Sequence, residues 1–202
     1  MSPRKAAALR DRDDADLRAH LVATARRLIA EQGGAGLTVR AIARAAGVAD
    51  GVLYNHFADK EELLAAALRA HVDAVHAELT PPPTPGAGTL AQNLLGWLDH
   101  GLALHRGILP VFTQLLAHPA VLTRYAQTPG TQPDWRDALT THLIAERALG
   151  RITPTADLDA TTAILVGICH DAVLSALFPG GPPHPTTTPT AVITTLLPSL
   201  TP

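Results

Sequence analysis

The sequence predicts an all-α protein with an N-terminal module of short helices and a larger helical body. Alanine and leucine, both good helix formers, dominate a chain that is 47% hydrophobic but only 3% aromatic. No long stretch alternates polar and apolar residues in the way a half-buried strand does, and apolar residues recur instead at spacings of three and four. The length of 202 residues suits one domain or two small ones.

The N-terminal module is predicted over residues 14–79, after an arm of residues 1–13 that we expect to be flexible because it is polar and charged. A first helix is expected from about Asp14 to Gln32, where the glycine pair that follows ends it. Its apolar stripe consists of Leu17, Leu21, Ala25, Leu28 and Ile29.

A helix-turn-helix is predicted at about residues 38–57. Thr38 is a suitable N-cap for the first of its helices, and Gly47 stands where the chain has to turn. A second short helix is expected at about residues 49–56. Asp59, with Glu62 three residues later, forms a capping box that begins the next helix. Two short helices joined by a tight turn are the unit that places one helix in a DNA major groove.

Three groups of residues at fixed spacing extend this observation: Ile42-Ala43-x-x-Ala46-Gly47-Val48, Gly51-x-Leu53-Tyr54-x-His56-Phe57 and Lys60-Glu61-x-Leu63. They resemble the N-terminal domain of the TetR family of transcriptional regulators, and the resemblance covers about residues 17–70. It implies a cytoplasmic, ligand-responsive regulator, most often a repressor, that binds a near-palindromic operator in double-stranded DNA as a homodimer. The competing interpretation is a small-molecule-binding protein or enzyme that keeps the three-helix module without DNA activity.

By position, the resemblance implies phosphate contacts from Thr38, Tyr54, His56 and Lys60, with Arg40 and Arg44 adding to them. The recognition helix then contributes Ala49, Asp50, Gly51, Val52 and Asn55. Ala49 and Asp50 depart from the usual family pattern. Asp50 either caps the recognition helix or accepts a hydrogen bond from a cytosine amino group. Gly51 is expected to allow a close approach, either between helices or between helix and DNA.

Charge is distributed unevenly along the chain. The net charge is −2, but residues 1–60 hold ten basic and seven acidic residues, a balance of +3. The rest of the chain holds six basic and eleven acidic residues, a balance of −5. The basic end is therefore the end that carries the motif, although the asymmetry is modest.

Residues 80–88, TPPPTPGAG, form a linker between the module and a regulatory and dimerisation body at residues 89–202. The body is expected to contain helices at about residues 89–106, 108–117, 119–126, 134–149, 155–178 and 189–200. The resemblance implies an effector pocket in this body, although each candidate residue suits an ordinary core at least as well. Its candidate lining is Trp97, His100, Leu104, Phe112, Leu116, Trp135, Leu139, His142 and Ile168. This lining favours an apolar or aromatic effector with one or two hydrogen-bonding groups.

A dimer interface is predicted where the last two helices carry small and apolar residues. The candidate residues are Ala160, Ala163, Gly167, Asp171, Leu174, Ile193, Leu196, Leu197 and Leu200. No apolar run is expected to span a membrane, and the single cysteine, Cys169, excludes an internal disulfide.

Catalytic and metal sites are not expected. Cys169, His170 and Asp171 combine suitable residue types, but consecutive side chains of a helix point about 100° apart and do not converge. His142 and Glu146 are four residues apart and either share a metal ion or form an exposed hydrogen-bonded pair, and we expect the exposed pair. The sequence therefore predicts no cofactor, no metal and no enzymatic activity.

Overall fold

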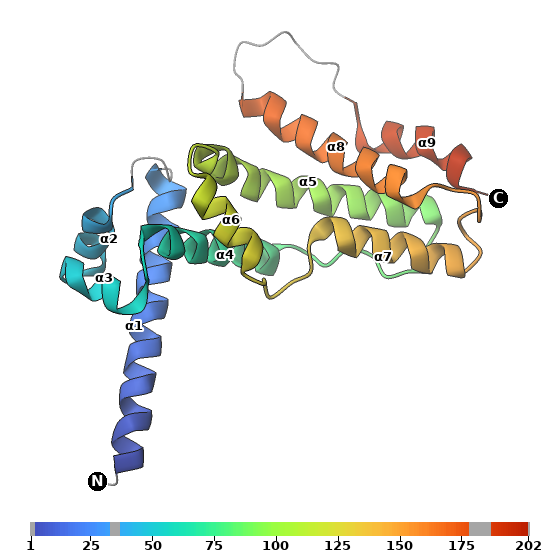
Figure 1. Cartoon of the computed structure of the whole chain (residues 1–202). Coiled ribbons are helices and arrows are strands. Elements are labelled where there is room, and N and C mark those ends of the chain that lie inside the picture. The colour runs from blue at the N-terminus through green and yellow to red at the C-terminus, as the bar shows by residue number, and fades with distance from the viewer. Residues whose placement is uncertain (1–2, 33–36, 178–186, 202) are drawn as a thin grey trace. The chain divides into compact units, whose positions relative to one another are not determined.

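The computed structural model describes residues 3–32, 37–177 and 187–201, with side chains at 13–31, 37–177 and 187–201. The regular secondary structure of this part of the chain consists of helices joined by loops, without strands (Figure 1). The helices are α1 (Pro3–Gln32), α2 (Val39–Ala46), α3 (Asp50–His56), α4 (Lys60–Glu78), α5 (Leu90–Leu115), α6 (Pro119–Gln127), α7 (Trp135–Ala148), α8 (Leu158–Leu177) and α9 (Pro189–Leu200). The all-α prediction is therefore confirmed for the described residues.

The chain divides into two compact units that differ from the expected boundaries. Unit 1 comprises residues 1–74 and 110–131, and unit 2 comprises residues 75–109 and 132–202. The end of α5 and all of α6 thus belong with the N-terminal module, while the last residues of α4 belong with the body. Helices α4 and α5 each run through both units, so this division does not fall at the proline-rich segment where the sequence indicated a boundary.

Unit 1 has a core of its own, built around α1 and the first part of α4. Leu21, Ala25 and Ile29 of the predicted stripe of α1 are almost completely buried. They share that core with Ile42 and Leu53 of the two short helices. The apolar spacing read from the sequence therefore identified the buried faces of this unit correctly.

Unit 2 has a separate core of leucines, valines and two tryptophans drawn from α5, α7, α8 and α9. Helix α8 has 20 residues and a mean hydropathy of 1.6, so by length and composition it is long enough to cross a membrane, contrary to expectation. The core helix of a globular protein can have the same length and composition. In α8, Leu165, Val166 and Cys169 are buried in the core of unit 2. Length and hydropathy alone therefore do not assign α8 to a bilayer.

Two helices are longer than the sequence indicated. Helix α1 begins at Pro3, so the backbone is helical through most of the expected flexible arm. Alanine-rich residues after a proline at the first helical position favour this outcome, although they show no apolar stripe. Helix α5 continues through Pro110 where two helices were expected, because one missing N–H donor does not end a helix that packs along its length.

Candidate nucleic-acid interface

The turn of the helix-turn-helix has the geometry that the sequence predicted. The hydroxyl of Thr38 accepts a hydrogen bond from the amide of Ala41 (3.1 Å) and caps α2. At the other end Gly47 has φ 73°, a left-handed conformation that a side chain would strain. The amide of Val48 then donates to the carbonyl of Ala43 (3.0 Å), which satisfies an end of α2 before α3 begins.

Helix α3 presents a polar face to solvent. Tyr54 is 60% exposed although it is a large aromatic residue, and Asn55 is exposed beside it. Leu53, on the opposite face, is buried. An exposed tyrosine next to an amide and two flanking basic side chains is a surface able to donate hydrogen bonds to phosphates and base edges. The flanking side chains are His56 and Lys60, both partly buried.

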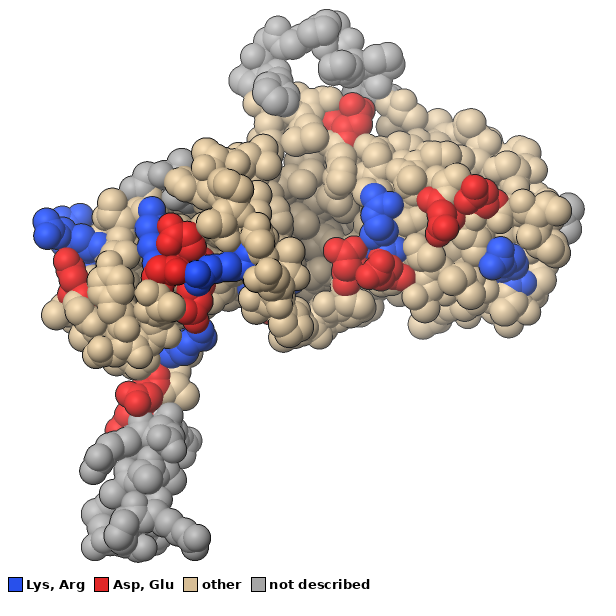
Figure 2. Space-filling model, in the orientation of Figure 1, with Lys and Arg blue, Asp and Glu red and all other residues tan. Residues whose placement is uncertain are grey.

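The structure corrects one of the two interpretations of Asp50. Ala49 occupies the N-cap position of α3 and has no side-chain cap, so Asp50 lies one residue inside the helix. Its carboxylate is 3.4 Å from Nε of Arg40 instead of bonding a helix amide. This pair is exposed and contributes little stability, but it neutralises part of the positive charge on this surface. Figure 2 shows acidic and basic side chains close together on unit 1.

The structure also excludes one of the two expected reasons for a glycine at position 51. A Cβ atom added there would meet no atom of the chain within 4 Å, so contact between helices does not require a glycine. Packing within unit 1 therefore gives no reason for a glycine at this exposed position.

Helix α4 is tied to two neighbours at its first turn. The predicted capping box is present: Oδ1 of Asp59 accepts from the amide of Glu62 (2.9 Å), and Oε2 of Glu62 accepts from the amide of Ala58 (2.8 Å). Arg124 of α6 donates to Oδ2 of Asp59 (2.6 Å), and Arg18 of α1 pairs with Glu62 (3.2 Å). These contacts fix the point at which the helix-turn-helix joins α4. Sequence reasoning missed them because α6 gave no signal of its partner.

The sequence also did not predict a second set of contacts between α4 and α6. The guanidinium of Arg69 lies 3.8 Å from the ring centroid of Tyr125, and it donates to the carbonyls of Tyr125 (2.9 Å) and Thr128 (2.7 Å). Carbonyls at a helix C-terminus lack partners within the helix, so Arg69 satisfies them from α4. A groove of about 590 Å³ lies between α1, α4 and α6 beside this contact, with alanines of α4 along it.

The candidate pocket residues do not form one group. Trp97, Leu104, Trp135, Leu139 and His142 are buried in unit 2, and His100 and Ile168 are partly buried there. Phe112 belongs to unit 1, where it packs edge-on against Tyr125, and Leu116 of the same unit is 67% exposed. An exposed leucine does not line an enclosed cavity. Both residues were expected in a cavity between the middle helices, but residues 110–131 belong to unit 1.

A group of aromatic rings in unit 2 went partly unrecognised in the sequence. The His105 ring lies edge-on to Trp135 (5.2 Å between centroids) and to His170 (4.9 Å). Burial lowers the pKa of His105, although its hydrogen bond to the Gly101 carbonyl opposes this, and burial also lowers the pKa of His170. The indole nitrogen of Trp135 is buried without an acceptor. Unit 2 therefore holds a neutral, largely apolar cluster with an unused hydrogen-bond donor.

The candidate dimer residues separate into two kinds. Ala160, Ala163, Gly167 and Asp171 share one exposed face of α8, together with Ile164, which is 46% exposed. On α9, by contrast, Ile193 and Leu200 are buried in the core of their own unit, so they are not available to a partner. Leu174, Leu196 and Leu197 are partly buried. Apolar periodicity alone did not distinguish a core face from an interface face on α9.

The residues considered for chemistry do not converge. Cys169 is fully buried and burial raises the pKa of its thiol to about 12, whereas Asp171 is exposed. His142 and Glu146 lie close together, with Nε2 3.4 Å from Oε1, but both are buried and not exposed as expected. Among the described residues, no three histidine, cysteine or carboxylate side chains gather as metal ligands do.

Comparisons with known proteins agree with the geometry of unit 1. A family model described as "Bacterial regulatory proteins, tetR family" matches residues 21–67. The HTH-type transcriptional repressor NemR of Escherichia coli strain K12 is 31% identical over 87 residues, which are 43% of this chain and 44% of that protein. The chain therefore matches less than half of the length of this curated relative.

Solved structures extend the likeness to the whole fold. A protein from Saccharomonospora viridis, solved in complex with choline, aligns over 93% of this chain and 99% of its own, with a TM-score of 0.65 and 18% identity. The multidrug binding protein EbrR, solved with imidazole, aligns over 89% of this chain and 93% of its own, with a TM-score of 0.50 and 29% identity. The family match at residues 21–67 and the fold of the whole chain together show a TetR-type helix-turn-helix module followed by a helical body like those of the solved structures.

Proposed function

We propose that this chain represses transcription by binding a near-palindromic operator as a homodimer, with α3 in the major groove. The single observation that carries the proposal is the polar, exposed face of α3 on a helix-turn-helix of this family. Tyr54, His56, Lys60 and Thr38 act as phosphate contacts, with Arg44 beside them. Asp50 and Arg40 neutralise each other, which lowers affinity for DNA of any sequence.

The homodimer forms through the exposed face of α8, where small residues let a second helix approach closely. The small residues that allow this approach are Ala160, Ala163 and Gly167, and Ile164 adds apolar area beside them. Figure 2 supports the proposal, because few charged side chains lie over α8 and α9. Partly buried Leu196 and Leu197 of α9 extend the interface.

An effector acts in the cytoplasm by binding unit 2 and releasing the operator. The buried residues Trp97, Trp135 and His142, with partly buried His100, form its site. The unused donor of Trp135 favours an effector with a hydrogen-bond acceptor on an apolar or aromatic frame. Burial lowers the pKa of His142, so the imidazole offers no positive charge to an anionic effector.

An electrophoretic shift with DNA from upstream of the chain's own coding sequence tests the proposal. The wild type is expected to retard one fragment in preference to unrelated DNA, and Tyr54→Phe with Lys60→Ala is expected to abolish that retardation. Equal retardation of all fragments, or none, excludes an operator-binding regulator of this DNA. A thermal-shift screen of uncharged aromatic compounds then tests the effector class, because a compound that binds only the folded state raises the melting temperature.

A further inference from the structure

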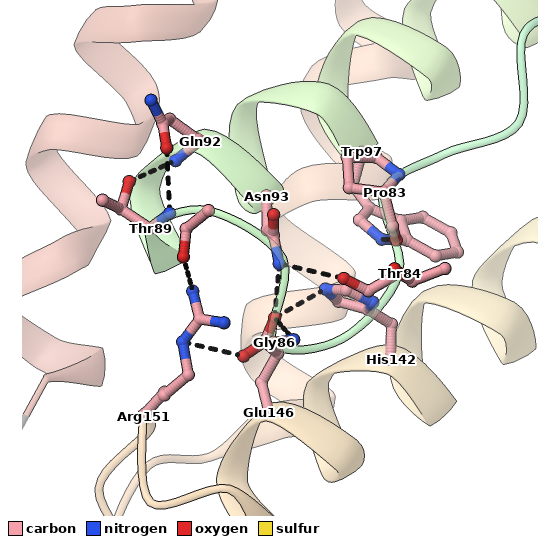
Figure 3. Close-up of polar contacts among 11 residues, drawn as sticks. Pro83, Thr84, Gly86, Thr89, Gln92, Asn93, Trp97, His142, Glu146 and Arg151 are labelled. Atoms are coloured by element: carbon pink, nitrogen blue, oxygen red, sulfur yellow. Dashed lines mark hydrogen bonds and ion pairs between the residues drawn. The ribbon is translucent and has the colours of Figure 1, made fainter.

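Residues 80–88, hereafter the strap, join α4 to α5 and contain four prolines and two glycines. Prolines have no backbone N–H, so the strap offers carbonyl acceptors but few donors. A flexible linker of this composition would leave those carbonyls to water. In this protein side chains of unit 2 instead bind the strap, and Figure 3 shows those of Asn93, Trp97, Glu146 and Arg151.

Five side chains hold the strap through its backbone. The contacts are His100 to the Thr80 carbonyl (2.9 Å), Trp97 to the Pro83 carbonyl (3.2 Å), Asn93 to the Thr84 carbonyl (3.2 Å), Glu146 to the Gly86 amide (3.1 Å) and Arg151 to the Gly88 carbonyl (3.0 Å). Three of these side chains come from α5, one from α7 and one from the turn after α7. The strap also packs tightly, since a Cβ on Gly96 would lie 2.6 Å from Pro83.

Glu146 is the centre of this arrangement. The residue is fully buried, and its Oε1 accepts from Asn93 (2.6 Å) as well as from the Gly86 amide. Its Oε2 lies 3.2 Å from Nε of Arg151. Burying a carboxylate is costly unless hydrogen bonds and an opposite charge compensate for it. A simple connection between two helices needs no such group, so the buried charge indicates a strap held in one specific position.

The strap contacts share residues with the proposed effector site, and this step rests on the proposed function. His142 packs against Trp97 with ring centroids 5.0 Å apart, and its Nε2 lies 3.4 Å from Oε1 of Glu146. Both ring nitrogens of His142 are buried without a hydrogen-bond partner. Either nitrogen is therefore available to a polar group of a bound molecule, and pairing with it would change the contacts of the imidazole with Glu146 and Trp97. Both of those residues bind the strap.

The end of α4 lies in the same unit as the strap. Val75 packs closely on α5, because a Cβ on Gly107 would lie 2.7 Å from its Cγ1. Helix α4 is continuous from Lys60 to Glu78, and Lys60 follows the recognition helix within four residues. The last turn of α4 therefore has an unbroken helical connection along the chain to the residues that follow α3.

We propose that Glu146, Asn93 and Arg151 form a lock that fixes the strap and the last turn of α4, and that opening the lock releases DNA. The effector opens it through His142 and Trp97. The lock is then the element with two states whose balance the effector shifts. A variant with an open lock imitates the effector and needs no ligand.

The test compares Glu146→Gln with Asp137→Asn, a matched acid-to-amide change at an exposed position of the same helix. Hydrogen exchange of the Gly86 amide and of residues 75–79 reports the lock, and the shift assay with the upstream fragment reports DNA affinity. We expect faster exchange at both places in Glu146→Gln and a loss of affinity on the order of tenfold. Asp137→Asn should match the wild type in both measurements.

Arg151→Gln is the second variant in case Glu146→Gln does not fold, because the Arg151 side chain is 22% exposed and tolerates change better. Faster hydrogen exchange with unchanged DNA affinity would mean that the lock only stabilises the fold, and this would overturn the proposal. Unchanged hydrogen exchange in the variant would also overturn it. If the wild type binds no DNA, the proposed function fails by itself. In that case, exchange that rises at Gly86 but not at residues 75–79 overturns the coupling between strap and helix.

Discussion

Gly167→Leu gives a prediction in which the stability of the protomer and the affinity of the dimer change in opposite directions. A Cβ added at Gly167 would meet nothing within 4 Å, so the protomer accommodates a side chain there without strain. Replacing a glycine inside a helix by leucine stabilises the helix by about 0.8 kcal/mol. The isolated protomer should therefore become slightly more stable.

The dimer should become weaker for the opposite reason. If the small residues of α8 let two helices meet, a leucine overfills that contact at a cost of about 1–3 kcal/mol, and the two-fold axis places the residue twice. The sum of about 2–6 kcal/mol raises the dissociation constant roughly 30-fold or more. Sedimentation velocity over a dilution series measures this constant.

Ala172→Leu is the control for this experiment, because Ala172 is exposed on α8 but lies off the stripe of Ala160, Ala163 and Gly167. It should leave the dissociation constant close to that of the wild type. A Gly167→Leu protein that dimerises with unchanged affinity would show that this face of α8 is not the interface. Equal weakening by both variants would mean that the interface is wider than the stripe.

Three other predictions concern DNA binding, pH and packing. Lys60→Ala should reduce the slope of log binding constant against log salt concentration by about one, and Tyr54→Phe should weaken binding to DNA of any sequence. Binding titrations at several salt concentrations measure both effects. Burial lowers the pKa of His105, His142 and His170 below 6.5, so the unfolded chain binds protons at these residues more tightly than the folded chain does. The folded state should therefore lose stability as the pH falls below about 6.5, and melting temperatures at about pH 7.5 and 5.5 measure this loss. Gly101→Ala should destabilise by about 1–3 kcal/mol in urea unfolding, because its Cβ would lie 2.3 Å from the ring of Trp135; Gly51→Ala, with open space, should not.

The sequence predicted unit 1 well because its signals are local. The Thr38 cap, the Gly47 turn and the Asp59 capping box each depend on residues within five positions, and all three are present. The buried stripe of α1 likewise depends on helical spacing alone. Local rules of this kind establish where helices begin and end, and which face each one buries.

Partners far apart in the chain were not predictable in the same way. Asn93 and Glu146 are 53 residues apart, and nothing near either of them indicates the other. The strap was read as a linker for the same reason, since its prolines show that a helix ends but not what binds the carbonyls. On α9, Ile193 and Leu200 suited a core and an interface equally, and only the packing of unit 2 assigned them to the core.

The chain passes between the two units at three places: inside α4 near residue 74, inside α5 near residue 109, and in the loop after α6 near residue 131. The first two crossings lie within continuous helices. At the second crossing Pro110 lacks the amide that would bond the carbonyl of Arg106, so α5 is less constrained there than α4 is at its own crossing. The α5 route then continues through α6 and reaches α4 by the contact of Arg124 with Asp59. Arg124→Ala removes the end of this route but leaves α4 intact. If strap release acts through α4, as the continuity of that helix favours, this variant should lose little of its DNA response to the lock.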